Sequence, residues 1–281
     1  MNPTEIRKVM KEIGGGANKR LGQHFLIDPH ALATIVEEAE IEQGDRVLEI
    51  GPGLGVLTGA LIEAGAHVTA VERDRRFVEY IESRMTNDEL RIMQGDAAKL
   101  DWENHFGKKA WKFVSNLPYS ITSLALRKAL YAKHPPTNIV VLVQREVAER
   151  AVARQQAKSN KQKGSLLSLM VALASHEARF VKRVAAGAFF PPPKVESAIL
   201  RIIPMTPEER RAIWGRDPEE IMAIAKRGFA HPRKLLASNL KLDPRILVEE
   251  GIHPKARAED LRPEDWARLA DVMEAAKLPF S

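Results

Sequence analysis

The strongest constraint on this chain's fold is the alternation of strand-like and helix-like segments that begins near residue 45. Short apolar runs that predict strands occupy residues 45–50, 67–72, 90–96, 111–116 and 138–144. Segments with helical spacing of apolar residues separate them at 55–65, 75–85 and 123–133, and another helix is expected to run to about residue 154. This βαβ rhythm predicts an α/β fold, with a parallel sheet covered by helices on both faces.

The pattern changes after residue 204. Residues 165–175 predict an apolar helix, and 176–184 and 197–204 predict two late strands. The proline-rich AFFPPPKV (188–195) between those strands is expected to form neither element. Beyond Pro204 every periodic segment is helical, so the sequence predicts two domains, an α/β domain over 1–204 and a small all-α domain over 205–281.

Composition narrows the class of protein. The 281 residues include no cysteine, which excludes disulfides, zinc–thiolate sites and cysteine nucleophiles. No apolar run approaches the ~18 residues of a membrane span, and the N-terminus lacks the apolar region of a secretory signal. We therefore expect a cytoplasmic protein without a membrane partner.

The charge distribution indicates a polyanionic partner. The net charge is +6 and the pI about 9.5. Residues 145–183 hold nine Lys or Arg against three acids, residues 220–245 six against two, and residues 1–20 five against two. One such run alone would be read as a solvated face, but three in one chain favour nucleic-acid binding by an N-terminal basic arm, a loop at 158–164 and the helical domain.

LEIGPGLGVLT (48–58) predicts a strand, a glycine turn and a helix. Gly51, Gly53 and Gly55 permit positive φ and a close approach of the backbone to a ligand. The nicotinamide fingerprint would need glycine where this chain has Val56, so that cofactor is not favoured.

Acidic residues end the next two predicted strands. Glu72 is placed to accept hydrogen bonds from ribose hydroxyls, and Asp96 from an adenine amino group. Structural alternatives are an ion pair of Glu72 with Arg73 or Arg75, and a turn capped by Asp96.

SNLPYS (115–120) follows the fourth predicted strand directly, and by itself it is typical of a turn. Its position beside the glycine turn and the two acidic strand ends gives this turn a predicted role in binding a substrate.

Seven motifs in order resemble one family. They are KRLGQHFLID (19–28), EIGPGLGVLT (49–58), VERD (71–74), QGDA (94–97), SNLPYSITS (115–123), FFPPPKVES (189–197) and FAHPRKLLASNL (229–240). The chain thereby resembles the ribosomal RNA small-subunit adenine dimethyltransferases of the KsgA type, relatives of the macrolide-resistance Erm enzymes. This resemblance implies a Rossmann-like methyltransferase sheet and S-adenosyl-L-methionine as cofactor.

The resemblance also implies which residues bind the cofactor. These are His24, Leu26, Gly51, Gly53, Glu72, Asp96 and Asn116. The family often has asparagine where this chain has His24, and again where it has Ser120.

The expected chemistry is methyl transfer to the exocyclic N6 of adenosine. The amide oxygen of Asn116 and a backbone carbonyl at Leu117 or Pro118 are expected to accept the N–H groups of that amine, while Pro118 stiffens the turn. Tyr119 is expected to offer a ring face to the flipped base and Phe189 the other face, whereas Phe190 is assigned to the core. No metal is expected, because His24, His176 and His231 show no metal-ligand spacing.

By resemblance, the substrate is the 3′-terminal hairpin of small-subunit (16S-type) rRNA, with two adjacent adenosines, in a pre-30S-like particle. A monomer is expected. One alternative is an Erm-type methylase of 23S rRNA, which Leu117 disfavours because Erm motifs usually read N-I-P-Y. Another alternative is a non-catalytic ribosome-assembly or transcription factor on the same fold.

Overall fold

The structure is a computed structural model that describes residues 1–15, 23–85, 88–154 and 163–275. Its first half contains α1 (Pro3–Glu12), β1 (Phe25–Leu26), α2 (Pro29–Ala39), β2 (Arg46–Ile50), α3 (Val56–Glu63), β3 (His67–Glu72), α4 (Arg75–Arg84), β4 (Leu90–Gln94), α5 (Trp102–Phe106), β5 (Lys112–Asn116), η2 (Tyr119–Ile121), α6 (Thr122–Leu130) and β6 (Asn138–Gln144). The second half contains α7 (Arg145–Val152), α8 (Leu166–Ala174), β7 (Ser175–Val184), η3 (Ala186–Ala188), β8 (Phe189–Phe190), β9 (Ser197–Pro204), α9 (Pro207–Trp214), α10 (Pro218–Gly228), α11 (Leu236–Leu240), α12 (Pro244–Glu249), η4 (Ala258–Asp260) and α13 (Pro263–Ala275). Every strand predicted from residue 45 onward is present.

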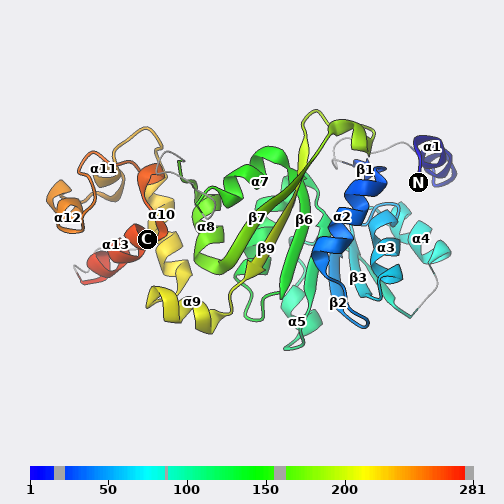
Figure 1. Cartoon of the computed structure of the whole chain (residues 1–281), viewed down its shortest axis with the longest axis horizontal. Helices are drawn as coiled ribbons and strands as arrows, with labels where there is room; N and C mark the ends of the chain where they lie inside the picture. The colour runs from blue at the N-terminus through cyan, green and yellow to red at the C-terminus, as the bar shows by residue number, and fades with distance from the viewer. Residues whose placement is uncertain (16–22, 86–87, 155–162, 276–281) are drawn as a thin grey trace. The chain divides into compact units, whose positions relative to one another are not determined.

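Seven strands form one mixed sheet in the order β4-β3-β2-β5-β6-β9-β7 (Figure 1). The strands from β2 to β6 pair in parallel, and β9 runs antiparallel beside β6. The α/β fold is confirmed, while the antiparallel strand β9 was not part of the predicted parallel sheet. The chain runs outward from β2 to β4 and then returns to β5, so the strand order reverses between β2 and β5. Ligands of open α/β sheets bind at such a reversal, outside the carboxyl ends of the strands.

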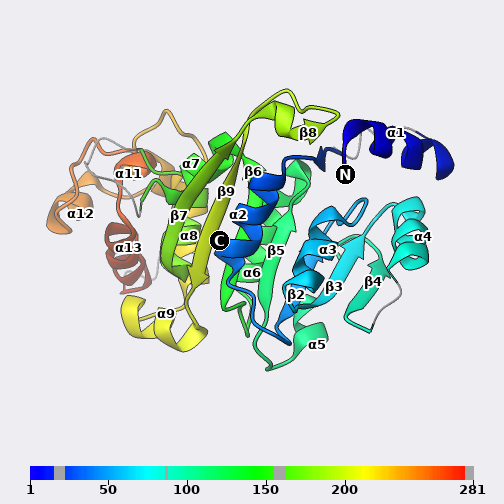
Figure 2. The same cartoon turned by 45° about the vertical axis from the view of Figure 1, so that its right-hand side comes forward.

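Both faces of this sheet are covered. Val47, Val114 and Val140 belong to one apolar cluster with Ile35 of α2 and Leu61 of α3. Figure 2 shows these two helices side by side in front of the sheet. On the other face, the ring of Trp102 in α5 packs against Phe113, which is fully buried, with 5.6 Å between the ring centroids. Burial on both faces explains why the central strands are continuous apolar runs.

A second, two-stranded sheet joins distant parts of the chain. Phe25 pairs with Phe190 and Leu26 with Phe189, antiparallel. The expectation that AFFPPPKV forms neither helix nor strand is therefore wrong for its two phenylalanines. The prolines follow the paired residues instead of interrupting them, and the partner strand lies too far away in sequence to be recognised locally.

The N-terminal segment begins with the helix α1, which is not among the helices predicted from the sequence. The side chain of Asn2 accepts hydrogen bonds from the backbone N–H groups of Thr4 and Glu5, and Glu5 bonds back to the N–H of Asn2. Ile6, Val9 and Met10 of α1 form a cluster with Phe25, Leu54 and Phe77. The predicted basic arm is thus helical over residues 3–12, whereas residues 16–22 lie outside the described part of the chain.

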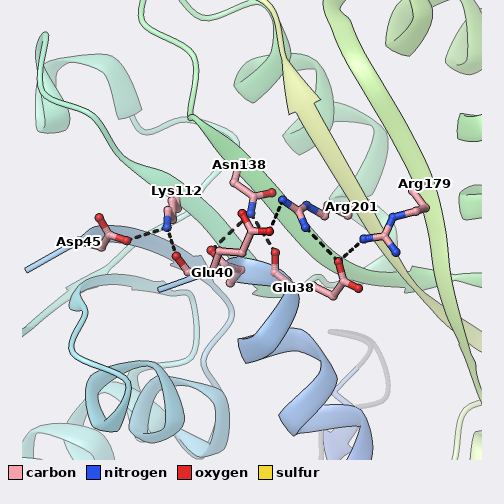
Figure 3. A network of polar contacts seen from close by, with 8 residues as sticks. Glu38, Glu40, Asp45, Lys112, Asn138, Arg179 and Arg201 are labelled. Atoms are coloured by element: carbon pink, nitrogen blue, oxygen red, sulfur yellow. Dashed lines mark hydrogen bonds and ion pairs between the residues drawn. The ribbon is translucent and has the colours of Figure 1, made fainter. Parts of the chain in front are cut away.

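A polar network fixes the C-terminal end of α2 to the sheet (Figure 3). Glu38 accepts from Arg179 of β7 at 2.5 Å and from Arg201 of β9 at 3.3 Å, and Arg201 also contacts Glu40 at 2.8 Å. The Asn138 amide donates to the carbonyl of Glu38 at 2.9 Å. Lys112 contacts both Asp45, at 2.7 Å, and the carbonyl of Glu40. Because Lys112 and Asn138 begin β5 and β6, this network lies at the end of these strands opposite to their carboxyl ends.

The chain divides into two compact units, Met1–Ala148 with Arg179–Pro204, and Glu149–Ala178 with Met205–Ser281. One division between the units falls after Pro204, and Glu149–Ala178 belongs to the same unit as the C-terminal helices. The two domains predicted from the sequence, over 1–204 and 205–281, stay a prediction. In the second unit, Trp214 Nε1 donates to the carbonyl of Leu173 in α8, and Trp266 of α13 is buried against Phe229. None of the helices in the described part of the chain has the length and apolar character needed to cross a membrane.

Candidate active site

A pocket open to solvent lies at the carboxyl ends of β2, β3, β4 and β5, and the space within its outline, open solvent included, is about 1190 Å³. Residues 23–26, 49–54, 56–57, 71–73, 77, 95–97 and 116–121 line it. The segments that the sequence singled out as three strand ends and a turn therefore meet in one place. Every predicted site residue except Phe189 is among the lining residues.

The glycine turn requires glycine for two reasons. Gly51, Gly53 and Gly55 have φ of 72°, 57° and 77°, in the left-handed region that L side chains avoid. A Cβ atom on Gly51 would also lie 3.2 Å from Cγ of Pro118. The turn before α3 thus packs directly against the turn after β5, and Val56 and Leu57 at the start of α3 line the pocket.

Glu72 ends β3 with a buried carboxylate held by backbone donors. Its Oε2 accepts from the N–H of Gly53 at 3.2 Å and its Oε1 from the N–H of Asp74 at 2.8 Å. Burial raises the pKa of Glu72, and these backbone donors oppose the rise. Among the described residues Glu72 forms no ion pair, and Arg75 pairs with Glu79 instead. The ion-pair alternative is therefore excluded, and the carboxylate retains lone pairs that face the pocket.

Asp96 follows β4 and combines both interpretations that the sequence allowed. Its Oδ1 accepts from the N–H of Ala98 at 3.0 Å, and its carbonyl accepts from the N–H of Lys99 at 2.9 Å. It therefore caps a turn, as a structural residue would. It also lines the pocket, where its other carboxylate oxygen has no hydrogen bond to the described residues.

Asn116 is the last residue of β5, and its amide is oriented by the chain. The amide nitrogen Nδ2 donates to the carbonyl of His24 at 3.3 Å, so the amide oxygen occupies the other arm of the side chain. Directly before it, the hydroxyl of Ser115 donates to the carbonyl of Ile50 at 2.7 Å in a buried position. The backbone N–H of Leu117 donates to the carbonyl of Leu142 at 3.1 Å. These bonds fix the strand end on both sides.

The sequence predicts that either the Leu117 or the Pro118 carbonyl accepts from the target amine, and the two differ in their hydrogen bonds. The carbonyl of Pro118 accepts from the N–H of Ile121 at 3.1 Å and from the hydroxyl of Thr122 at 3.4 Å. The side chain of Leu117 is buried, and its carbonyl oxygen accepts no hydrogen bond from the described residues. Leu117 therefore offers the available acceptor beside the Asn116 amide.

Tyr119 starts the short helix η2, and two contacts hold its ring. Its hydroxyl shares a hydrogen bond of 2.7 Å with Oγ of the buried Ser197, and its ring stacks on His24 with 6.1 Å between the centroids. Burial raises the pKa of the Tyr119 phenol, and the bond to Ser197 opposes the rise. The phenol therefore stays protonated at physiological pH and keeps the hydrogen that it can share with Ser197.

His24 and Leu26 both line the pocket from β1 and the residue before it. The imidazole Nδ1 of His24 donates to the carbonyl of Pro191 at 2.7 Å. The side chain of His24 therefore binds another part of the chain, while its backbone carbonyl accepts the hydrogen bond from Asn116. The apolar side chain of Leu26 is buried in the pocket wall.

Of the two phenylalanines of β8, Phe189 does not lie where a stacking surface is expected, whereas Phe190 packs against the cluster formed by α1, Phe25 and Phe77. Phe189 is 3% exposed, packs in the core cluster with Leu26 and Val184, and does not line the pocket. Phe190 is partly exposed, and the guanidinium of Arg7 lies 4.7 Å from its ring centroid. The structure therefore gives no support to Phe189 as a stacking surface. The reason is its pairing with Leu26, which turns its side chain into the core.

Glu49 lines the pocket as well, although the sequence predicts no role for it. This residue lies between the buried Leu48 and Ile50 of β2, is 1% exposed, and accepts a hydrogen bond of 2.7 Å from the hydroxyl of Thr58. Burial raises its pKa to about 8, and the charge of Glu72 adds to the rise. An acidic residue inside an apolar strand directly before a glycine turn is the signal that could have revealed it. No group of three acidic or histidine side chains suited to a metal ion occurs in the part of the chain that the structure describes.

The fold and the pocket define the class as an α/β methyltransferase. A crystal structure of a dimethyladenosine transferase from Plasmodium falciparum matches 92% of this chain and all of its own length, with a TM-score of 0.75 and 24% identity. A crystal structure of the 23S rRNA methyltransferase ErmE matches 89% of this chain and 99% of its own, with a TM-score of 0.65 and 25% identity.

The family is shown by sequence. The family model described as ribosomal RNA adenine dimethylase matches residues 15–275. A ribosomal RNA small subunit methyltransferase A from Nostoc sp. is 36% identical over 272 residues, which cover 91% of this chain and 97% of the relative. The chain belongs to the ribosomal RNA adenine dimethylase family.

Proposed function

We propose that this enzyme transfers methyl groups from S-adenosylmethionine to N6 of two adjacent adenosines in the 3′-terminal hairpin of small-subunit rRNA. The observation that carries this proposal is the pair of acceptors at the end of β5. The Asn116 amide is oriented by the His24 carbonyl, and the Leu117 carbonyl beside it has no partner among the described residues. Both lie in the same pocket as Gly51, Glu72 and Asp96.

The residues present fit the proposed cofactor. The glycine turn lets the backbone approach a ligand, and the buried carboxylate of Glu72 can accept hydrogen bonds from two ribose hydroxyls. Asp96 can accept from an adenine amino group at the neighbouring strand end. When bound, S-adenosylmethionine supplies an electrophilic methyl group on its sulfonium.

The chain's own residues act on the target base. The exocyclic amine is a poor nucleophile because its lone pair is delocalised into the ring. Acceptance of its two N–H groups by the Asn116 oxygen and the Leu117 carbonyl favours a tetrahedral nitrogen that can attack. The ring of Tyr119, fixed by Ser197, offers a face on which the flipped base can stack. The methylated amine is acidic enough to lose its proton to water, so this site needs no strong general base.

The small-subunit substrate is supported by the relatives, which are named ribosomal RNA small subunit methyltransferase A. We propose that basic side chains outside the pocket contact the RNA backbone. One such group lies on the exposed segment 230–235 of the second unit, which carries His231, Arg233 and Lys234. Most of the predicted loop 158–164 lies outside the described residues. We further propose that the enzyme acts as a cytoplasmic monomer on a pre-30S-like particle.

The test uses purified enzyme, labelled cofactor and immature small subunits from a strain that lacks the modification. Mass spectrometry of the rRNA nucleosides should show dimethyladenosine at the two adjacent positions. Large subunits serve as the parallel substrate. Label on 23S rRNA alone would favour an Erm-type activity, and binding to small subunits without any methylation would favour a non-catalytic assembly factor.

A further inference from the structure

Lys128 of α6 makes contacts that the proposed mechanism does not use. Its ammonium donates to the carbonyls of Ala97 at 3.3 Å, Ala98 at 3.2 Å and Leu100 at 2.5 Å. The same nitrogen lies 4.8 Å from the centroid of the Trp102 ring. A lysine ammonium has three N–H donors, and here three carbonyls are available to accept them.

These carbonyls belong to the turn that carries Asp96. Within the turn, Asp96 accepts from the N–H groups of Ala98 and Lys99 through its side chain and its carbonyl. Asp96 thus accepts hydrogen bonds from N–H groups of the turn, whereas three carbonyls of the turn accept hydrogen bonds from Lys128. The Trp102 indole N–H donates to the carbonyl of Ala97 at 2.9 Å as well. Asp96 and Ala97 line the pocket, whereas Lys128 does not.

The Lys128 ammonium is partly removed from water, and the three carbonyls take the place of water as its hydrogen-bond acceptors. Burial lowers the pKa of Lys128, and the charges of Asp101 and Asp96 oppose this effect. Charge-assisted hydrogen bonds to carbonyls are stronger than neutral ones, and a carbonyl left without its partner is costly when it is partly buried. Loss of the ammonium should therefore loosen the turn and displace Asp96.

We propose that Lys128 is a positioning residue for the adenosine part of the cofactor, because it fixes the Asp96–Leu100 turn against α6. This inference rests on the proposed function for the identity of the cofactor. Lys128 lies in the helix that directly follows η2, so the same contacts connect the cofactor side of the pocket with the element that carries Tyr119.

The test compares Lys128→Met, Lys128→Arg and the matched control Lys99→Met. Lys99 lies in the same turn with an exposed side chain, so its replacement removes the same charge without removing the contacts to the carbonyls. Calorimetry without RNA gives the dissociation constant of S-adenosylhomocysteine. Steady-state methylation gives KM for the cofactor and kcat.

Lys128→Met should raise both the dissociation constant and KM for the cofactor by about tenfold, with kcat within about twofold of the wild type. Lys128→Arg should recover part of the affinity, and Lys99→Met should match the wild type. The inference is overturned if Lys128→Met binds the cofactor as tightly as the wild type, or if Lys99→Met weakens binding equally. Thermal unfolding of each variant identifies a general loss of fold, and in that case Lys128→Arg decides the outcome.

These results are separable from the proposed function. If the wild-type enzyme binds the cofactor but methylates no small-subunit adenosine, the proposed function is wrong. The role of Lys128 is then still tested by the dissociation constants of the variants. A wild-type enzyme that methylates, with Lys128→Met indistinguishable from it, would remove this inference alone.

Discussion

The side-chain nitrogen of Asn116 donates to the backbone carbonyl of His24, 3.3 Å away. A carbonyl oxygen can only accept, so this contact determines which arm of the amide carries the oxygen. The residue before β1 thereby orients the acceptor that ends β5. The peptide group of His24 contributes this acceptor irrespective of its side chain, which bonds to the carbonyl of Pro191.

Asn116→Ala should abolish most methylation while leaving the cofactor bound. Removal of one preorganised hydrogen-bonding group at a reacting centre costs about 10²–10³ in kcat. Steady-state kinetics on small subunits measures the loss, and calorimetry with S-adenosylhomocysteine and a filter-binding assay with RNA serve as controls. Near-normal methylation by this variant would show that the role given to Asn116 is wrong.

The hydrogen bond between Tyr119 and Ser197 should be measurable as a coupling. Tyr119→Phe and Ser197→Ala each remove the same bond and keep the ring, so each should lower kcat/KM for RNA several-fold. The double variant should be no worse than either single variant, because one interaction is lost in all three. Tyr119→Ala, which also removes the stacking face, should lose a further ~1–3 kcal/mol of transition-state stabilisation. Additive effects of the two single changes would contradict this coupling.

Glu49 should make the folded state less stable as the pH rises. Its pKa is raised to about 8 by burial, from an ordinary value of 4.5, so the folded protein keeps a proton that the unfolded chain has lost between these values. The contribution of Glu49 to the free energy of unfolding is therefore fully present below pH 4.5. It falls by up to about 1.4 kcal/mol per pH unit as the pH rises toward 8.

Glu49→Gln removes this titration and keeps the shape of the side chain. Denaturant unfolding between pH 5 and pH 8.5 should show the variant gaining stability relative to the wild type as the pH rises, with a plateau above about pH 8. A difference between the two proteins that stays constant with pH would show that Glu49 is not protonated in the fold.

The sequence was informative where the signal is local. Strands with continuous apolar runs, the glycine turn and the acidic strand ends could be recognised because periodicity and positive φ depend on neighbours in the chain. These local features pointed to the glycine turn, to Glu72 and Asp96, and to the turn after Asn116, all of which line the pocket. His24 and Leu26, which also line it, were predicted only through the resemblance to the family. The resemblance to a family added the order of the motifs and the expected chemistry.

Other features depend on pairings between distant segments. The strand pairing of Phe25–Leu26 with Phe189–Phe190 turns Phe189 into the core, and no pattern around Phe189 reveals this. The same holds for the contact of Ser197 with Tyr119 and for the carbonyls gathered by Lys128. Glu49 was visible as an acid in an apolar strand, but its raised pKa follows from burial that only the folded sheet produces.

Glu38 should contribute more to stability than its neighbour Glu40. The Glu38 side chain is 15% exposed and contacts both Arg179 and Arg201, whereas Glu40 is 62% exposed and contacts Arg201. Glu38→Ala leaves partly buried guanidinium groups without this carboxylate, so we expect a loss of about 2–3 kcal/mol in the free energy of unfolding. Glu40→Ala should cost below about 1 kcal/mol. Urea unfolding measures both, and equal losses would contradict the role of burial in this network (Figure 3).

Gly51→Ala should impair both stability and catalysis, and Gly44→Ala provides the matched control. Both glycines have positive φ, 72° and 85°, so an L side chain at either position costs about 1–2 kcal/mol of backbone strain. A Cβ atom on Gly44 would meet nothing within 4 Å, whereas on Gly51 it would lie 3.2 Å from Cγ and 3.3 Å from Cδ of Pro118. We expect relief of that contact to shift Pro118, and with it the turn that carries Asn116 and Tyr119. Gly51→Ala should therefore lower kcat/KM at least about tenfold at a temperature where both variants are folded, whereas Gly44→Ala should stay near the wild type. If the two variants lose activity equally, strain alone accounts for the loss, and the contact between the glycine turn and Pro118 has no part in catalysis.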